Sequence, residues 1–264
     1  FGSRPPRLSG KTGPSGMGDR GEPTAEPLRL LCLHGHGGYG ERLCRQLEER
    51  LLSAAAGGAA STAPPGPGVE LRCIDAPFAE PSRRQEGRQW WRYDDGGDGD
   101  RPDDWAEMEV AATRIAEELH APARPYDGVL GFSQGAEMVH TLAVLAHRGD
   151  PRFCGPRMPR FAVSLSGAVN PGHFEAPGAG GPPPGCLGPK APPGFGGLRL
   201  PVLFVGDFKR DEWYAPARFE DTLDLYADAT VVRHAEAHSV PSLGSEAGTV
   251  VRGFLARFAA ARAE

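Results

Sequence analysis

The sequence predicts an α/β domain with a mostly parallel central sheet and helices on both faces of that sheet. Short, nearly continuous apolar runs alternate along the chain with segments in which apolar residues recur at helical spacing. Runs without polar alternation are typical of strands buried on both faces, as parallel strands are. Strands that alternate with helices along the whole chain indicate repeated βα units.

Each element is predicted from its own pattern. The run at 28–35 ends at a glycine and the run at 69–77 stops at a proline, as strands commonly do. The helix over 103–121 has the clearest pattern, because Asp104 and Glu107 have capping-box spacing and apolar residues follow at helical intervals. The predicted strands span 28–35, 69–77, 126–132, 160–167, 200–207 and 228–235, and the predicted helices span 40–52, 103–121, 135–149, 215–227 and 245–263.

Glycine and proline divide the chain of 264 residues unevenly. The 37 glycines and 27 prolines crowd into residues 1–27, 53–68 and 171–197, and the remainder has ordinary globular composition. We therefore expect a disordered N-terminal tail over 1–27 and one domain over 28–262, with low-complexity insertions near 53–68 and 171–197. The sequence begins at Phe1 and not at Met, so it does not exclude an organellar targeting segment ahead of Phe1.

Charge and cysteine content narrow the classes of partner. The net charge is −5 and no sustained Lys/Arg stripe occurs, so nucleic acid is not an expected partner. No apolar run has the length of a membrane span. The five cysteines lack CxxC spacing, which predicts a reducing compartment without a disulfide framework or a zinc site. Cys32 and Cys73 lie in strand-like runs and are expected to be buried thiols.

The segment GFSQG at 131–135 fits the pattern G-x-S-x-G, with a predicted strand before it and a predicted helix after it. In that context the serine occupies a strained turn, and the flanking glycines leave room for the crossing backbone. The turn lifts the Ser133 hydroxyl above the sheet edge and points the first N–H groups of the helix at whatever Ser133 attacks. The pattern predicts that Ser133 is a nucleophile.

A serine nucleophile needs a base and an orienting acid. In this type of fold they follow the serine in the order acid, then histidine. His238 lies in the loop after the last predicted strand and is the expected base, whereas His234 ends the strand itself and is interpreted as structural support. The acid should follow the strand at 200–207, where Asp211 is preferred and Asp207 stays a candidate.

The glycine-rich loop after the first strand, LHGHGGYG, is expected to complete an oxyanion hole. Its glycines allow close backbone approach, and the N–H of His36 would act with the N–H of Gln134. The same loop fits neither a metal site, because its two histidines lack other ligands at suitable spacing, nor a P-loop, because it lacks the Lys-Ser/Thr ending. No cofactor is expected.

Other suggestive residues have simpler interpretations. The acidic stretch at 89–104 lacks the ordered spacing of an EF-hand and is expected to be a solvated loop. Trp90 and Trp91 are expected to pack in the core or in a lid. Ser164 and Ser166 lie at a strand end without an elbow and are not nucleophile candidates.

Five motifs, LRLLCLHGHGG, CIDAPF, YDGVLGFSQGAEM, FAVSLSG and HAEAHSVPS, occur in this order. Together they resemble the FSH-type family of serine hydrolases, the ovarian-cancer-associated-esterase-like branch of the α/β-hydrolases. The resemblance implies an α/β-hydrolase fold and Ser133, His238 and an aspartate after VLFVG as catalytic residues. It also implies a cytoplasmic protein that can enter the nucleus. The sequence departs from the family where its acid usually stands, because Lys209 occupies that position.

These observations predict an esterase or thioesterase that acts on small to medium acyl substrates through an acyl-enzyme. The alternative is a binding protein on the same fold, which senses a small ligand with slow or absent turnover, because a fold does not determine function. The acyl chain length, the choice between ester and thioester, and the oligomeric state have no signature in the sequence.

Overall fold

The computed structural model describes residues 26–52, 68–80, 87–92, 105–169, 197–242 and 245–260. Its centre is a six-stranded sheet in the order β2-β1-β5-β6-β7-β8, in which all neighbouring strands are parallel. The predicted fold class is therefore confirmed. The strands are β1 Leu28–Leu33, β2 Val69–Ile74, β5 Gly128–Phe132, β6 Phe161–Leu165, β7 Val202–Gly206 and β8 Ala229–Arg233.

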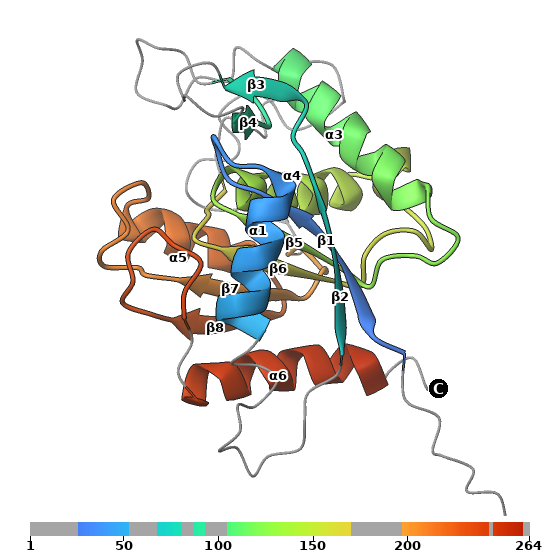
Figure 1. Ribbon diagram of the computed structural model, residues 1–264. Coiled ribbons are helices and arrows are strands. Elements are labelled where there is room, and N and C mark those ends of the chain that lie inside the picture. The colour runs from blue at the N-terminus through green and yellow to red at the C-terminus, as the bar shows by residue number, and fades with distance from the viewer. Residues whose placement is uncertain are drawn as a thin grey trace, which may run out of the picture.

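Helices cover both faces of this sheet (Figure 1). One core joins the sheet to α1 and α6, through buried residues such as Leu43 and Phe254. The other core joins the opposite face to α3 and α4, through residues such as Ile115 and Leu142. The helices are α1 Gly40–Gln46, continued by the π-helical turn η1 Leu47–Leu52, then α3 Trp105–His120, α4 Gln134–His147, the short η2 Pro151–Phe153, α5 Pro216–Asp224 and α6 Ser245–Ala260.

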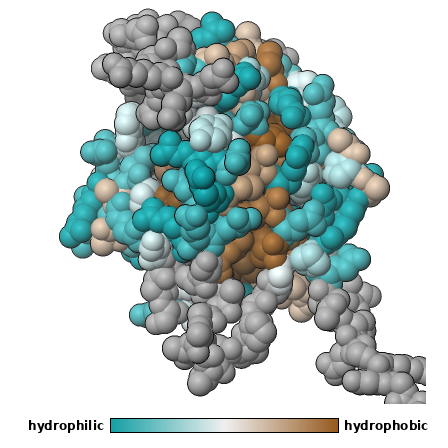
Figure 2. Space-filling view, in the orientation of Figure 1, coloured by the Kyte–Doolittle hydropathy of each residue, from teal (hydrophilic) through white to brown (hydrophobic). Residues whose placement is uncertain are grey.

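The face that carries α1 is not uniformly polar. Figure 2 shows hydrophobic surface running between polar residues on this side of the molecule. Among the described residues, the apolar side chains that pack on the α1–α6 core and stay partly exposed include Val69 and Leu71 of the edge strand β2 and Phe258 of α6.

A small antiparallel hairpin, β3 Phe78–Glu80 with β4 Gly87–Gln89, was not predicted from the sequence. Its strands are only three residues long and carry no alternation of polar and apolar residues. The hairpin contacts the glycine-rich loop after β1 through a bridge between Gly38 and Arg88. A Cβ at Gly87 would lie 2.9 Å from the Gly37 carbonyl oxygen, so this approach requires glycine.

Several sequence predictions fall outside the described residues. These are nearly all of the N-terminal tail, the insertions near 53–68 and 171–197, and the acidic loop from residue 93 to residue 104. The domain boundaries therefore stay predictions. Among the residues that the structure does describe, no helix is long and apolar enough to cross a membrane.

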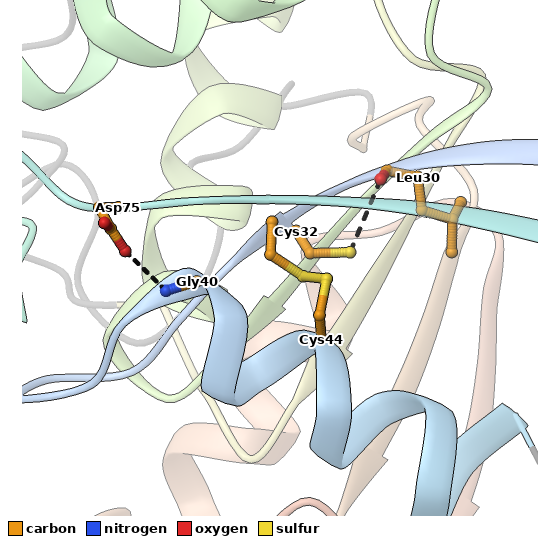
Figure 3. The surroundings of a disulfide bond; sticks show 6 residues. Leu30, Cys32, Gly40, Cys44 and Asp75 are labelled. Atoms are coloured by element: carbon orange, nitrogen blue, oxygen red, sulfur yellow. Dashed lines mark hydrogen bonds between the residues drawn. A yellow bond between two sulfur atoms is a disulfide. The ribbon is translucent and has the colours of Figure 1, made fainter.

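Cys44 and Cys73 form a disulfide, which corrects the prediction that the chain has none (Figure 3). The sequence could not reveal this pair, because the two residues are 29 positions apart and meet only when α1 packs beside β2, with their Cα atoms 5.9 Å apart. Cys73 is thus not the buried thiol that we expected. Cys32 is one, since it is fully buried and burial raises the pKa of its thiol strongly, which suppresses exchange with the disulfide.

The disulfide is expected to contribute about 3.5 kcal/mol to the free energy of unfolding, because it closes a loop of roughly 30 residues in the unfolded chain. Replacing both Cys44 and Cys73 by serine should remove this contribution in a urea titration. The exposed free thiol of Cys154 offers a matched control, and Cys154→Ser should leave the titration unchanged. An unaltered midpoint in the double variant would contradict the expected stabilisation.

A polar cluster lies fully buried beneath the sheet. His140 of α4 bonds to the Tyr226 hydroxyl at 2.6 Å through Nδ1 and to the Ser164 hydroxyl at 2.9 Å through Nε2. Ser164 in turn donates to the Gly167 carbonyl, so it accepts from His140 Nε2–H. The neutral ring then accepts at Nδ1 from the Tyr226 hydroxyl. Burial lowers the pKa of His140 to about 3. Ser164 therefore has a structural role, in keeping with its lack of an elbow.

This cluster predicts a pH dependence of stability. The folded His140 has a lower pKa than the unfolded residue, so the unfolded state binds more protons between pH 6.5 and about 3. The contribution of neutral His140 to the free energy of unfolding is complete above pH 6.5. It falls by about 1.4 kcal/mol per pH unit as the pH drops through this range. Urea unfolding from pH 7 to pH 4 should give a steeper slope for the wild type than for His140→Gln, which keeps polar ends but does not titrate. Equal slopes would contradict this assignment.

Candidate active site

Ser133 lies at a sharp turn between β5 and α4. Its backbone angles are φ 54° and ψ −122°, a strained conformation for a residue with a side chain. The turn requires glycine on both sides, because a Cβ at Gly131 would lie 2.2 Å from the Gly135 carbonyl oxygen and one at Gly135 would lie 2.1 Å from the Leu33 carbonyl oxygen. The predicted elbow geometry is therefore present, and α4 begins directly after Ser133.

Three side chains from distant loops form a hydrogen-bonded chain at this turn. His238 Nε2 lies 2.8 Å from Ser133 Oγ. On the other side of the ring, His238 Nδ1 lies 2.9 Å from Asp211 Oδ2 and 3.1 Å from Oδ1. The Asp211 side chain is fully buried and the His238 side chain is 11% exposed. The imidazole is thus oriented by a buried carboxylate while its far nitrogen faces the serine.

The competing sequence candidates lie elsewhere. Asp207 contacts backbone N–H groups and not His238, with Oδ1 accepting from Lys209 and Arg210 and Oδ2 accepting from Ala237.

His234 accepts a hydrogen bond from the Glu236 N–H at Nδ1, and burial lowers its pKa despite the nearby carboxylates of Asp207 and others. Neither residue bonds to Ser133.

The loop after β1 lies directly against Ser133. A Cβ at Gly35 would lie 3.0 Å from Ser133 Cβ, so a larger residue there would force its neighbours to shift. The Gly35 carbonyl accepts from the Gly38 N–H at 3.0 Å and from His34 Nδ1 at 2.8 Å. In a trans peptide the N–H points opposite to the carbonyl, so the His36 N–H faces away from His34.

His34 is a buried structural residue and not a metal ligand. Its Nε2 accepts from the Ala76 N–H at 3.0 Å while Nδ1 donates to the loop, which requires the neutral ring. Burial lowers the pKa of His34, in agreement with that state. The His36 side chain points to the hairpin, where Nε2 lies 2.8 Å from Glu80 Oε2 and 3.1 Å from Gln89 Oε1.

Gln134 and Trp90 connect the start of α4 to the loop after β1. The Gln134 side chain accepts from the Trp90 N–H and donates to the Trp91 carbonyl. Trp90 is fully buried and its indole N–H donates to the His34 carbonyl at 2.8 Å. Both ends of the Gln134 side chain are therefore hydrogen-bonded within the core. The expected oxyanion donor is the backbone N–H of Gln134. Both tryptophans pack in the core, one of the two roles expected of them.

Aromatic rings surround His238. The ring centroids of Phe132, Tyr214 and Trp213 lie 5.4, 5.8 and 5.9 Å from its own. Trp213 is 69% exposed, an unusual state for a large aromatic side chain. These rings make the surroundings of the histidine apolar.

Two supporting contacts had no signal in the sequence. The Tyr214 hydroxyl donates to Glu137 Oε1, a buried pairing across 77 positions that ties the Asp211 loop to α4. Ser166, at φ 46°, donates its hydroxyl to the Ser239 carbonyl and so holds the His238 loop. Both depend on long-range packing. Within the described residues, no group of three or more His, Cys, Asp or Glu side chains could hold a metal ion.

Comparison with known proteins adds to this geometry. The family model described as Serine hydrolase (FSH1) matches residues 24–250. The chain belongs to this family. Esterase OVCA2 of Bos taurus is 29% identical to this FSH1 family member over 251 residues, covering 89% of the chain and 99% of the bovine protein. Esterase OVCA2 of Homo sapiens is 32% identical over 152 residues, which cover 53% of the chain and 64% of the human protein.

Solved structures agree on the fold of this FSH1 family member. The Bacillus cereus carboxylesterase has a TM-score of 0.54 at 15% identity, covering 90% of the chain and 91% of its own. Acyl-protein thioesterase 2 of Zea mays has a TM-score of 0.53 at 18% identity, covering 89% and 95%. At such low identity these similarities establish the α/β-hydrolase fold alone.

Proposed function

We propose that the protein hydrolyses carboxylic esters or thioesters of small to medium acyl groups through an acyl-enzyme on Ser133. The observation that carries this proposal is the hydrogen-bonded chain from Ser133 Oγ through His238 to Asp211. Membership in a serine hydrolase family supports it. No step requires a metal or an organic cofactor.

In the first half-reaction, Ser133 Oγ attacks the acyl carbonyl carbon while His238 Nε2 takes the hydroxyl proton. Asp211 holds Nδ1–H and stabilises the imidazolium that forms. The carbonyl oxygen gains a negative charge, and the backbone N–H groups of His36 and Gln134 donate hydrogen bonds to it. Loss of one such donor typically costs about 2.7–4 kcal/mol of transition-state stabilisation.

The tetrahedral intermediate then collapses. The bond to the leaving group breaks, and His238 returns its proton to the departing alcohol or thiol. In the second half-reaction a water molecule takes the place of the alcohol, and His238 accepts its proton as the water attacks the acyl carbon. The free acid leaves, and Ser133 recovers its proton from His238.

The surroundings favour an apolar substrate. Phe132, Tyr214 and the exposed Trp213 flank the imidazole, so a group held against His238 contacts aromatic surface. This arrangement suits apolar acyl or leaving groups better than charged ones. It does not distinguish an oxygen ester from a thioester, because both use the same nucleophile and base.

The proposal is tested by turnover of p-nitrophenyl esters and acyl thioesters of graded chain length. Hydrolysis should be measurable in the wild type and should fall by about 10²–10⁴-fold in His238→Ala, because general-base assistance is lost. His120→Ala, which changes an exposed histidine of α3, is the control. Ligand-induced thermal stabilisation without turnover would favour a binding protein instead. Turnover that His238→Ala leaves unchanged would show that His238 is not the base.

A further inference from the structure

We propose that Asp207 is a positioning residue that fixes the loop of Asp211 and the loop of His238 relative to one another. The inference rests on the proposed function, because it assigns Asp207 a role in assembling that site. Asp207 follows β7 directly, the residue is only 3% exposed, and its carboxylate accepts hydrogen bonds from backbone N–H groups and not from Ser133 or the ring of His238.

One carboxylate oxygen shapes the acid loop. Asp207 Oδ1 accepts from the Lys209 N–H at 3.1 Å and from the Arg210 N–H at 3.0 Å. The main-chain carbonyl of Asp207 accepts from the Asp211 N–H at 3.1 Å. These hydrogen bonds hold residues 207–211 in a compact turn, and the turn fixes the position of the Asp211 Cα atom.

The other oxygen reaches the base loop. Asp207 Oδ2 accepts from the Ala237 N–H at 3.0 Å, across 30 positions of sequence. Ala237 directly precedes His238 and has φ 52°, a left-handed conformation that alanine rarely adopts. Such a conformation persists only where its surroundings hold it, and the hydrogen bond that the Ala237 N–H donates to Asp207 is one of the contacts that do so.

The chemistry of this junction calls for a carboxylate. Three N–H donors point at one small side chain, and two acceptor oxygens on opposite sides are needed to meet donors from two loops. Burial raises the pKa of the Asp207 carboxyl, but the three backbone N–H bonds and nearby His234 outweigh it and hold the pKa below its ordinary value. The group is therefore ionised at neutral pH, and its charge strengthens these hydrogen bonds.

Two further bonds join the same loops but act farther from His238. Arg210 Nη1 donates to the Ala235 carbonyl at 3.2 Å, and the His234 N–H donates to the Gly206 carbonyl at 3.2 Å. They keep the loops adjacent when Asp207 is changed. A substitution at Asp207 should consequently loosen the alignment of His238 with Asp211 and leave the sheet intact.

The first test is Asp207→Asn, which retains one acceptor oxygen and turns an NH₂ group toward an N–H donor. We expect kcat for an acyl ester to fall by about 10- to 100-fold, as small misplacements of catalytic groups do, with KM changed by less than about threefold. Asp150→Asn is the matched control, because Asp150 also caps a turn through a backbone N–H, at Arg152, but lies at η2 away from the site. Equal kcat in wild type and Asp207→Asn would overturn the proposal.

A double-mutant cycle separates positioning from a general loss of structure. If Asp207 acts through the contact between His238 and Asp211, Asp207→Asn should lower kcat by less than about threefold in an Asp211→Asn background. A full multiplicative loss in that background would mean that Asp207 acts independently, and would overturn the proposal. Asp207→Ser extends the test, since a short hydroxyl can cap the Lys209 turn but does not reach Ala237.

Failure of the proposed function gives a different pattern. In that case Ser133→Ala keeps wild-type turnover, whereas failure of this inference alone leaves Ser133→Ala and Asp211→Asn inactive beside a fully active Asp207→Asn. Circular dichroism and thermal melting accompany each variant. If both Asp207→Asn and Asp207→Ser fail to fold, Asp207 is required for folding and the positioning role is rejected.

Discussion

Ser133→Ala is expected to lower kcat for an acyl ester by at least about 10⁴-fold, because it removes the atom that forms the acyl-enzyme. The fold should survive the change. The N–H of residue 133 still donates to the Leu165 carbonyl, and alanine has no greater difficulty than serine in adopting φ 54°. The residual rate then reports what the oxyanion donors and substrate binding achieve without the nucleophile.

The measurement is kcat with the ester that the wild type hydrolyses fastest, alongside a thermal melt of each protein. Ser242→Ala is a suitable control, since Ser242 is exposed and its hydroxyl accepts a hydrogen bond from Arg50 and not from a residue of the site. Retention of a tenth or more of wild-type turnover in Ser133→Ala would place the chemistry on another residue.

Asp211→Asn is expected to lower kcat by about 10³–10⁴-fold with little change in KM. An asparagine of the same size turns an NH₂ group toward His238 Nδ1 or presents a weaker acceptor, so the imidazole loses its orientation and the imidazolium loses its counter-charge. The loop should stay in place, because the amide oxygen can still accept from the Trp213 and Tyr214 N–H groups that Oδ1 now binds.

Steady-state kinetics of Asp211→Asn beside Asp228→Asn tests this expectation. Asp228 pairs with Arg257 and its side chain is 42% exposed, so its change removes the same charge without touching the site. If Asp228→Asn and Asp211→Asn behave alike, the carboxylate that contacts His238 has no special role, and the order serine, acid, histidine along this chain would need another acid.

The fold was largely predictable because its signals are local. Buried parallel strands such as 28–33 and 202–206 appear as apolar runs, and helices such as α3 carry both periodicity and a capping pattern. The hairpin β3–β4 and the Cys44–Cys73 disulfide were missed for the opposite reason. The hairpin strands are too short to show a pattern, and the disulfide depends on how α1 packs beside β2.

The candidate site was predictable in part. Ser133 stands out because the elbow demands glycine on both sides, a requirement visible in the sequence. The choice between Asp207 and Asp211 was not visible, since both follow β7 and only the path of the turn sends one toward His238 and the other toward Ala237. Supporting contacts such as Trp90 with His34 join residues more than 50 positions apart and leave no local signal.

The central claim is that Ser133 is an activated nucleophile, and covalent labelling tests it most directly. A fluorophosphonate probe should modify the folded wild-type protein at a single site, which peptide mass spectrometry should locate at Ser133. Ser133→Ala should remain unlabelled, and His238→Ala should be labelled far more slowly, because the imidazole is the base that activates the hydroxyl. Absence of labelling in well-folded wild-type protein, or an adduct on any other residue, would contradict the claim.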